Sequence, residues 1–186
     1  LLKRLPNSWF GKNARLSLKN TAPLISWKSR FFLAGLHPLY FLSEKTLLVH
    51  GSPLEPATEY LRGGQETAIS LQYLYAEGFK LCFCGHTHQA AVYYVDRREY
   101  GALYPVPEQT ITLNKDCAIV NPGSVGFPRI FGATANRETE LADKTHFPAY
   151  FTLWDTKAHT ITFKAAYYDA HTTNEKIKQR LGTTLL

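Results

Sequence analysis

The chain has 186 residues, enough for one domain, and its 45% hydrophobic and 13% aromatic residues can form a core. It holds no apolar run of eighteen residues and no apolar leader before a small-residue cleavage site. We therefore expect neither a membrane span nor a secretory signal. The three cysteines lie in apolar, strand-like runs, and an odd number there is typical of reduced thiols in a cytoplasmic protein.

Positive charge gathers near the N-terminus. Residues 1–45 hold eight of the 21 Lys and Arg but one of the 15 Asp and Glu, with aromatic residues interleaved. Such a mixture could bind nucleic acid, although a solvated helix face is the commoner origin of a basic run. We favour the second interpretation and expect no nucleic-acid partner.

The first twenty residues show no clear period, and we expect them to be irregular. Asn20 or Thr21 can then cap a helix with Pro23 in its first turn, and Gly35 is placed to end it. Further helices are expected at residues 56–61 and 65–77, and from Thr172, which forms a capping box with Glu175. Expected strands are residues 39–42, 46–50, 79–84, 89–95, 102–104, 110–113, 117–121, 150–154 and 160–165.

Helix precedes strand early in the chain and antiparallel pairs dominate late, which predicts an α/β class with mixed sheets. We expect a long surface loop at residues 130–147, which are polar and lack a period. Residues 1–186 should form a single domain.

Three of the expected strands end in polar, glycine-bearing segments. Residues 81–89 read Leu-Cys-Phe-Cys-Gly-His-Thr-His-Gln, residues 46–53 end in His-Gly-Ser-Pro, and residues 118–126 contain Asn-Pro-Gly-Ser. An α/β sheet builds a site from such strand ends along one edge. Gly85 should allow a tight turn before His86 and His88.

His86 and His88 on so short a tether suit a metal, because neutral imidazole is a borderline-soft nitrogen donor. The alternative is a pair of polar loop histidines with ordinary hydrogen bonds. Cys82 and Cys84 share a strand face and could also bind metal, but we interpret them as small buried hydrophobic residues.

In this order, the three segments resemble the calcineurin-like metallophosphoesterases. They are most similar to the small bacterial phosphodiesterase branch, whose chains carry His-Gly-Ser-Pro, Gly-His-Thr-His and Asn-Pro-Gly-Ser-Val. The resemblance runs from about Leu36 to the C-terminus and rests on three motifs that agree in type, order and rough spacing.

The resemblance implies mixed sheets in an αββα sandwich, here without its N-terminal part. It also implies hydrolysis of phosphomono- or phosphodiesters by a hydroxide that two divalent metal ions activate. His50 and His86 would bind one ion and His88 the other, and the ions would be Mn, Fe, Zn, Co or Ni. The substrate is expected to be a phosphate ester, and the catalytic residues are left unassigned.

The segment Asn121, Gly123 and Ser124 would line this site. Ser124 and backbone N–H groups could meet a phosphate, or the segment could be a turn that simply ends a strand. Both interpretations stay open at this point.

The sequence also departs from the family pattern. The family places Asp-x-His, Gly-Asp and Gly-Asn-His-Asp segments before this region, and none of them occurs here. They supply a bridging aspartate, a ligand asparagine and a histidine thought to assist the leaving group. Three histidines without a bridging carboxylate cannot hold two close cations against their mutual repulsion.

We therefore expect the chain to carry half of a metal site. Either the rest lies outside these residues, or the protein is an inactive metallophosphoesterase-fold chain that serves as a protein-binding module. Because the chain begins at Leu1 and contains no methionine, we expect it to be a fragment or a processed chain.

Overall fold

The computed structural model describes residues 10–126 and 146–181, which divide into two compact units. The helical unit consists of the described residues up to His37 and from Asp169 onward, and the sheet unit is Pro38–Tyr168. The single domain expected over residues 1–186 stays a prediction. Among the helices described, none is long and apolar enough to cross a membrane.

The helical unit differs from expectation in where its helices begin. Residues 12–20, expected to be irregular, are helical. Ser26 caps the next helix: its Oγ accepts a hydrogen bond of 3.1 Å from the Ser29 N–H. The expected helix from Asn20 or Thr21 is wrong because the chain becomes extended at Ile25. The elements are α1 (Lys12–Thr21), the 3-10 helix η2 (Ala22–Leu24), α2 (Trp27–Gly35) and α5 (Ala170–Leu181).

Helix α5 begins before Thr172. Asp169 Oδ1 accepts hydrogen bonds from the backbone N–H groups of His171, at 2.9 Å, and Thr172, at 3.3 Å. Asp169 therefore takes the capping role that the sequence suggested for Thr172.

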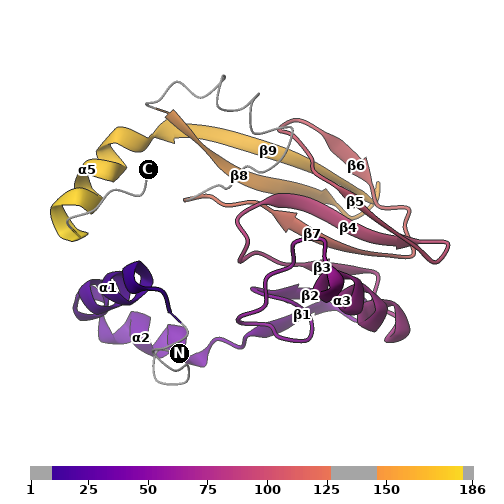
Figure 1. Cartoon of the computed structure of the whole chain (residues 1–186), viewed down its shortest axis with the longest axis horizontal. Helices are drawn as coiled ribbons and strands as arrows, with labels where there is room; N and C mark the ends of the chain where they lie inside the picture. The colour runs from indigo at the N-terminus through magenta and orange to yellow at the C-terminus, as the bar shows by residue number, and fades with distance from the viewer. Residues whose placement is uncertain (1–9, 127–145, 182–186) are drawn as a thin grey trace. The chain divides into compact units, whose positions relative to one another are not determined.

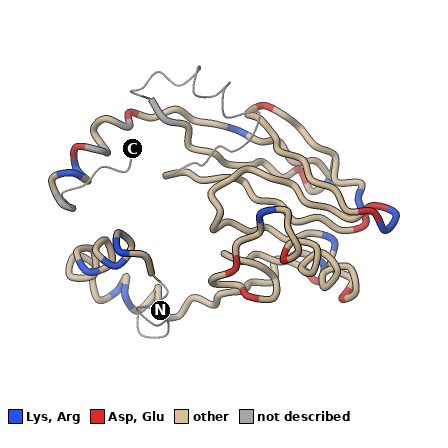
Figure 2. Tube along the Cα trace, in the orientation of Figure 1, with Lys and Arg blue, Asp and Glu red and all other residues tan. Residues whose placement is uncertain are grey.

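Among the basic residues near the N-terminus, Lys12, Arg15 and Lys19 lie on α1 and Lys28 and Arg30 on α2, and no Asp or Glu occurs between residues 10 and 37 (Figure 2). Their side chains are exposed, as are Trp27 and Phe31 at 74% and 79%. The solvated helix face and the absence of a nucleic-acid partner both stay predictions.

The sheet unit is built on a six-stranded mixed sheet in the order β1-β2-β3-β7-β4-β5 (Figure 1). Strands β2, β3 and β7 are parallel, and the others pair antiparallel. The strands are β1 (Leu39–Ser43), β2 (Thr46–Val49), β3 (Leu81–Phe83), β4 (Ala90–Asp96), β5 (Glu99–Leu103) and β7 (Cys117–Pro122).

A second sheet has three strands in the order β6-β9-β8. They are β6 (Thr110–Thr112), β8 (His146–Asp155) and β9 (Thr160–Asp169). The mixed α/β class with two sheets is thus confirmed. Of the surface loop expected at 130–147, residues 130–145 lie outside the described part of the chain and residues 146–147 belong to β8.

Helix α3 (Gln65–Ala76) covers one face of the larger sheet. Leu71 and Leu74 of α3 pack there with Cys82, Tyr93 and Ile119. The short helix expected at residues 56–61 is absent, and the chain there forms turns. The reason is local. In a helix the Pro56 carbonyl would accept a hydrogen bond from the N–H group four residues later. Here it accepts from the His50 and Gly51 N–H groups instead.

The opposite face of the larger sheet packs on the smaller one. Leu81, Val92 and Val120 form a buried cluster with Ile161 and Phe163 of β9. Neighbouring residues along β3, β4 and β7 thus point to opposite layers, as the pleat requires. The central strands are buried on both faces and their ends are fixed firmly.

The three cysteines belong to the cluster under α3 and are free thiols. Burial raises the pKa of all three, that of Cys84 and Cys117 to about 12. Metals bind the thiolate, so burial disfavours metal binding by Cys82 and Cys84. They are the small buried hydrophobic residues that the sequence indicated.

Candidate metal-binding site

The polar segments that follow β2, β3 and β7 meet at one edge of the sheet. The strands pair in parallel and in register. The Gly85 N–H donates to the His50 carbonyl and the Cys84 N–H donates to the Val120 carbonyl, both at 2.9 Å. Backbone hydrogen bonds therefore continue past the strands and hold the three segments together.

The imidazoles of His50 and His86 lie side by side at this edge. Their ring centroids are 4.6 Å apart and the rings are inclined by 60°. Two imidazoles bound to one ion at about 2.0–2.1 Å have ring centres within roughly 6.5 Å of each other. The pair therefore satisfies the spacing that a shared cation requires.

The loop after β3 is strained at its histidines and not at its glycine. His86 and His88 both have a φ of 61°, in the left-handed region, whereas Gly85 has no positive φ. A β-carbon on Gly85 would lie 3.7 Å from His50 Nδ1, an ordinary contact. The turn expected at Gly85 is thus made by His86 and His88, and strain of this kind concentrates at functional sites.

Residues 58–60 fix the His86 ring. Burial lowers the His86 pKa, and a hydrogen bond between the ring and the Thr58 backbone partly opposes this shift, as it does when the ring N–H donates to the carbonyl. The Tyr60 ring stacks on His86 with centroids 3.8 Å apart. Metal-binding histidines commonly donate their second N–H to a carbonyl, which leaves the other nitrogen as the ligand.

The net effect of the surroundings keeps both rings neutral. Burial, followed by the charge of His88, lowers the His50 pKa. Burial also lowers the His86 pKa, and the charges of His50, His88 and Arg62 act in the same direction. Neutral imidazole is the form that binds metal, so His50 and His86 fit a cation chemically as well as geometrically.

Over residues 10–126 and 146–181, no three or more His, Cys, Asp or Glu side chains are grouped so as to hold an ion. The described residues thus bring His50 and His86 together and place the charge of His88 near both. Joint metal binding by His50, His86 and His88 stays a prediction.

Asn121 holds the histidine loop against β7. Its side chain is buried, with 1% exposed. The Nδ2 atom donates to the Gly85 carbonyl at 2.7 Å and to Thr87 Oγ1 at 2.8 Å, while Oδ1 accepts from the Gly123 N–H at 3.0 Å. Both the Asn121 side chain and the Gly123 N–H are therefore committed to hydrogen bonds within the protein. That the segment lines a phosphate site stays a prediction.

The turn after β7 needs its glycine. Gly123 has a φ of +94°, and a β-carbon there would lie 2.9 Å from Cβ of Tyr150. The Ser124 carbonyl accepts from the Tyr150 N–H at 3.0 Å, which joins the turn to β8. Contact between Ser124 and phosphate stays a prediction.

Several residues that shape the site were not singled out from the sequence. Buried Ser52 accepts a hydrogen bond of 2.9 Å from the Glu55 N–H, and its Ser-x-x-Glu spacing was an available signal. Tyr60 and Arg62 gave no such signal, because they reach His86 from an irregular segment. The Arg62 guanidinium lies 4.7 Å from the Tyr60 ring centre.

No family model matches the sequence, and no curated protein matches it. Among solved structures, the chain is similar to a metallophosphoesterase from Sphaerobacter thermophilus, with a TM-score of 0.69 and 21% identity over 95% of this chain. The chain spans 65% of the length of that protein. At this identity the likeness shows the fold: the chain has the mixed α/β fold of a metallophosphoesterase.

Proposed function

We propose that the protein containing this chain is a metal-dependent phosphoesterase that hydrolyses phosphomono- or phosphodiesters. We further assign it to the calcineurin-like enzymes and their small bacterial phosphodiesterase branch. The observation that carries the proposal is the approach of the His50 and His86 rings to 4.6 Å at the ends of neighbouring parallel strands. Fold likeness to a metallophosphoesterase supports it.

In this proposal His50 and His86 bind one divalent ion and His88 binds another, each through a neutral imidazole. Imidazole together with carboxylate and water suits Mn, Fe, Zn, Co or Ni. Bound cations supply Lewis-acid stabilisation of the charge on the phosphoryl oxygens. The chain's own contribution is orientation: the Thr58 carbonyl fixes the His86 ring, and Asn121 fixes the loop that carries His86 and His88.

The test is hydrolysis of p-nitrophenyl phosphate and bis(p-nitrophenyl) phosphate by the natural protein, after chelation and again after addition of Mn²⁺. We expect hydrolysis that depends on Mn²⁺. His86→Ala and His88→Ala should each lower kcat/KM by at least about 100-fold, since even residues that only orient metal ligands contribute 10- to 100-fold. His159→Ala, in the turn between β8 and β9, is the matched control and should retain activity.

The competing hypothesis is an inactive protein-binding module with the same fold. It predicts that neither ester is hydrolysed with any of the five metals, and that result would overturn the proposed function.

A further inference from the structure

A second feature of the site edge is a three-membered stack. The Tyr60 ring lies against His86 with centroids 3.8 Å apart and an interplanar angle of 25°. The guanidinium carbon of Arg62 lies 4.7 Å from the centre of the same Tyr60 ring, within the range of a cation–π interaction. The Tyr60 ring therefore contacts both His86 and the Arg62 guanidinium, which carries a positive charge.

This charge is exposed and is not neutralised by the protein. The Arg62 side chain is exposed, and no carboxylate in the described ranges forms an ion pair with it. Tyr60 is also 41% exposed, so solvent reaches the stack. An anion could therefore contact the guanidinium without first breaking a salt bridge.

The guanidinium group of Arg62 suits an oxyanion, and phosphate is the oxyanion that the proposed function brings to this edge. Guanidinium presents paired N–H donors that match two phosphate oxygens, and charge-assisted hydrogen bonds of this kind are short and strong. An exposed arginine side chain loses conformational freedom when it binds an anion, and this loss costs free energy. Because the Tyr60 ring already restricts the Arg62 side chain, binding an anion costs it less freedom.

We propose that Arg62, held over Tyr60 beside His86, binds oxygens of the substrate's phosphate group. The inference rests on the proposed function and deepens it, because it assigns a substrate-binding residue outside the three histidines. Arg62 supplies binding and orientation, and Tyr60 acts as a positioning residue through its ring.

The experiment measures binding of labelled inorganic phosphate to the natural protein by equilibrium dialysis in the presence of Mn²⁺. Arg62→Ala should weaken phosphate binding by about 10- to 100-fold, the loss expected when a hydrogen bond to a charged group is removed. Arg62→Lys should recover part of the affinity, because it keeps the charge and loses the paired donors. Tyr60→Phe keeps the ring and should bind like the wild type, whereas Tyr60→Leu should bind more weakly.

Arg98→Ala is the matched control, an exposed arginine in the β4–β5 turn, and should leave phosphate affinity unchanged. Equal affinity of Arg62→Ala and wild type overturns the inference, as does a wild-type protein that binds no phosphate. Failure of the proposed function is distinguishable: phosphate binding would still depend on Arg62, while neither nitrophenyl ester would be hydrolysed.

Discussion

Asn121 connects two segments that are distant in sequence. Its partners, Gly85 and Thr87, lie on the loop after β3; the Asn121 and Thr87 side chains are buried, and Gly85 is partly exposed. Asn121→Ala removes both of these hydrogen bonds and the one that the Gly123 N–H donates to Oδ1, and it should lower the free energy of unfolding by about 1–3 kcal/mol. Urea unfolding measures the effect. Asn114→Ala, an exposed asparagine, is the control, and an equal response of the two variants would contradict the role given to Asn121.

Gly123 is required by both its backbone conformation and its surroundings. With a φ of +94° and Tyr150 Cβ 2.9 Å from the added atom, Gly123→Ala should destabilise the protein by about 1–3 kcal/mol. Gly126→Ala meets nothing within 4 Å and should change stability by less than about 0.5 kcal/mol. Thermal unfolding of the two variants compares them, and equal melting temperatures would refute the argument.

At the scale of single residues, the sequence indicated His50 and His86 correctly as neighbours, because parallel strands bring their carboxyl ends together. It could not reveal the function of Asn121, since its partners lie 34 and 36 residues away in sequence. It also missed Tyr60 and Arg62, because they lie in an irregular segment whose sequence has no period that would show where its side chains point.

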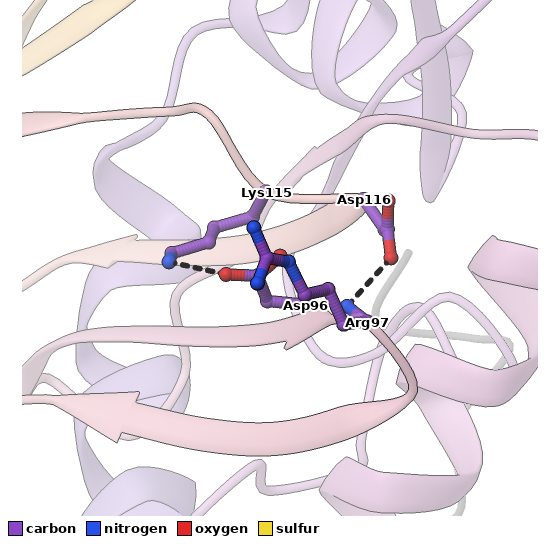
Figure 3. Close-up of polar contacts among 4 residues, drawn as sticks. All are labelled: Asp96, Arg97, Lys115 and Asp116. Carbon is purple, nitrogen blue, oxygen red and sulfur yellow. Dashed lines mark hydrogen bonds and ion pairs between the residues drawn. The ribbon is translucent and has the colours of Figure 1, made fainter.

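Among the elements, the β4–β5 hairpin offers a direct test of turn chemistry. Arg97 and Arg98 have φ values of 50° and 70°, the geometry in which Asn-Gly is preferred. The Arg97 N–H donates to Asp116 Oδ2 at 2.9 Å, and Lys115 pairs with Asp96 at 2.7 Å (Figure 3). These contacts join the turn to Lys115 and Asp116, just before β7 begins. His50 and His86 lie near the opposite end of β7.

Replacing Arg97 with Asn and Arg98 with Gly should raise the free energy of unfolding by roughly 0.5–1 kcal/mol. The relief of left-handed strain exceeds the entropy that glycine adds to the unfolded chain. Thermal unfolding measures the gain. The double change to alanine removes the same charges without relieving strain, so a similar gain there would argue against the turn geometry.

Most strands could be predicted because apolar runs bounded by turn residues are an unambiguous signal. The start of α3 at Gln65 could also be predicted. The starts of α2 and α5 could not, because several capping residues compete in residues 20–26 and at 169–172, and tertiary context selects Ser26 and Asp169.

For the molecule as a whole, the histidine cluster should make stability depend on pH. The pKa values of His50 and His86 lie below the unfolded value of 6.5, first because of burial. The folded state then binds fewer protons than the unfolded state, so the stabilisation is present above pH 6.5 and is lost as pH falls through the lowered values. Hydrogen bonds, chiefly from the Ala158 N–H and from Thr172, lower the pKa values of Asp155 and Asp169 from 3.8. These two carboxylates therefore change the stability only below about pH 3.8.

Chelated protein should therefore show a falling free energy of unfolding between pH 6.5 and pH 5 in denaturant titrations. The His50→Gln, His86→Gln double variant should show a smaller fall over the same interval. A wild-type profile no steeper than that of the double variant would mean that these rings are not held neutral by the fold.

The most direct test of the central claim is the transition-metal content of the purified natural protein, measured by elemental analysis. The account predicts near-stoichiometric metal in the wild type and in the His159→Ala control. The His50→Ala, His86→Ala double variant should retain almost none. Equal metal content in the double variant and the wild type, or no metal in either, would contradict a cation site at His50 and His86.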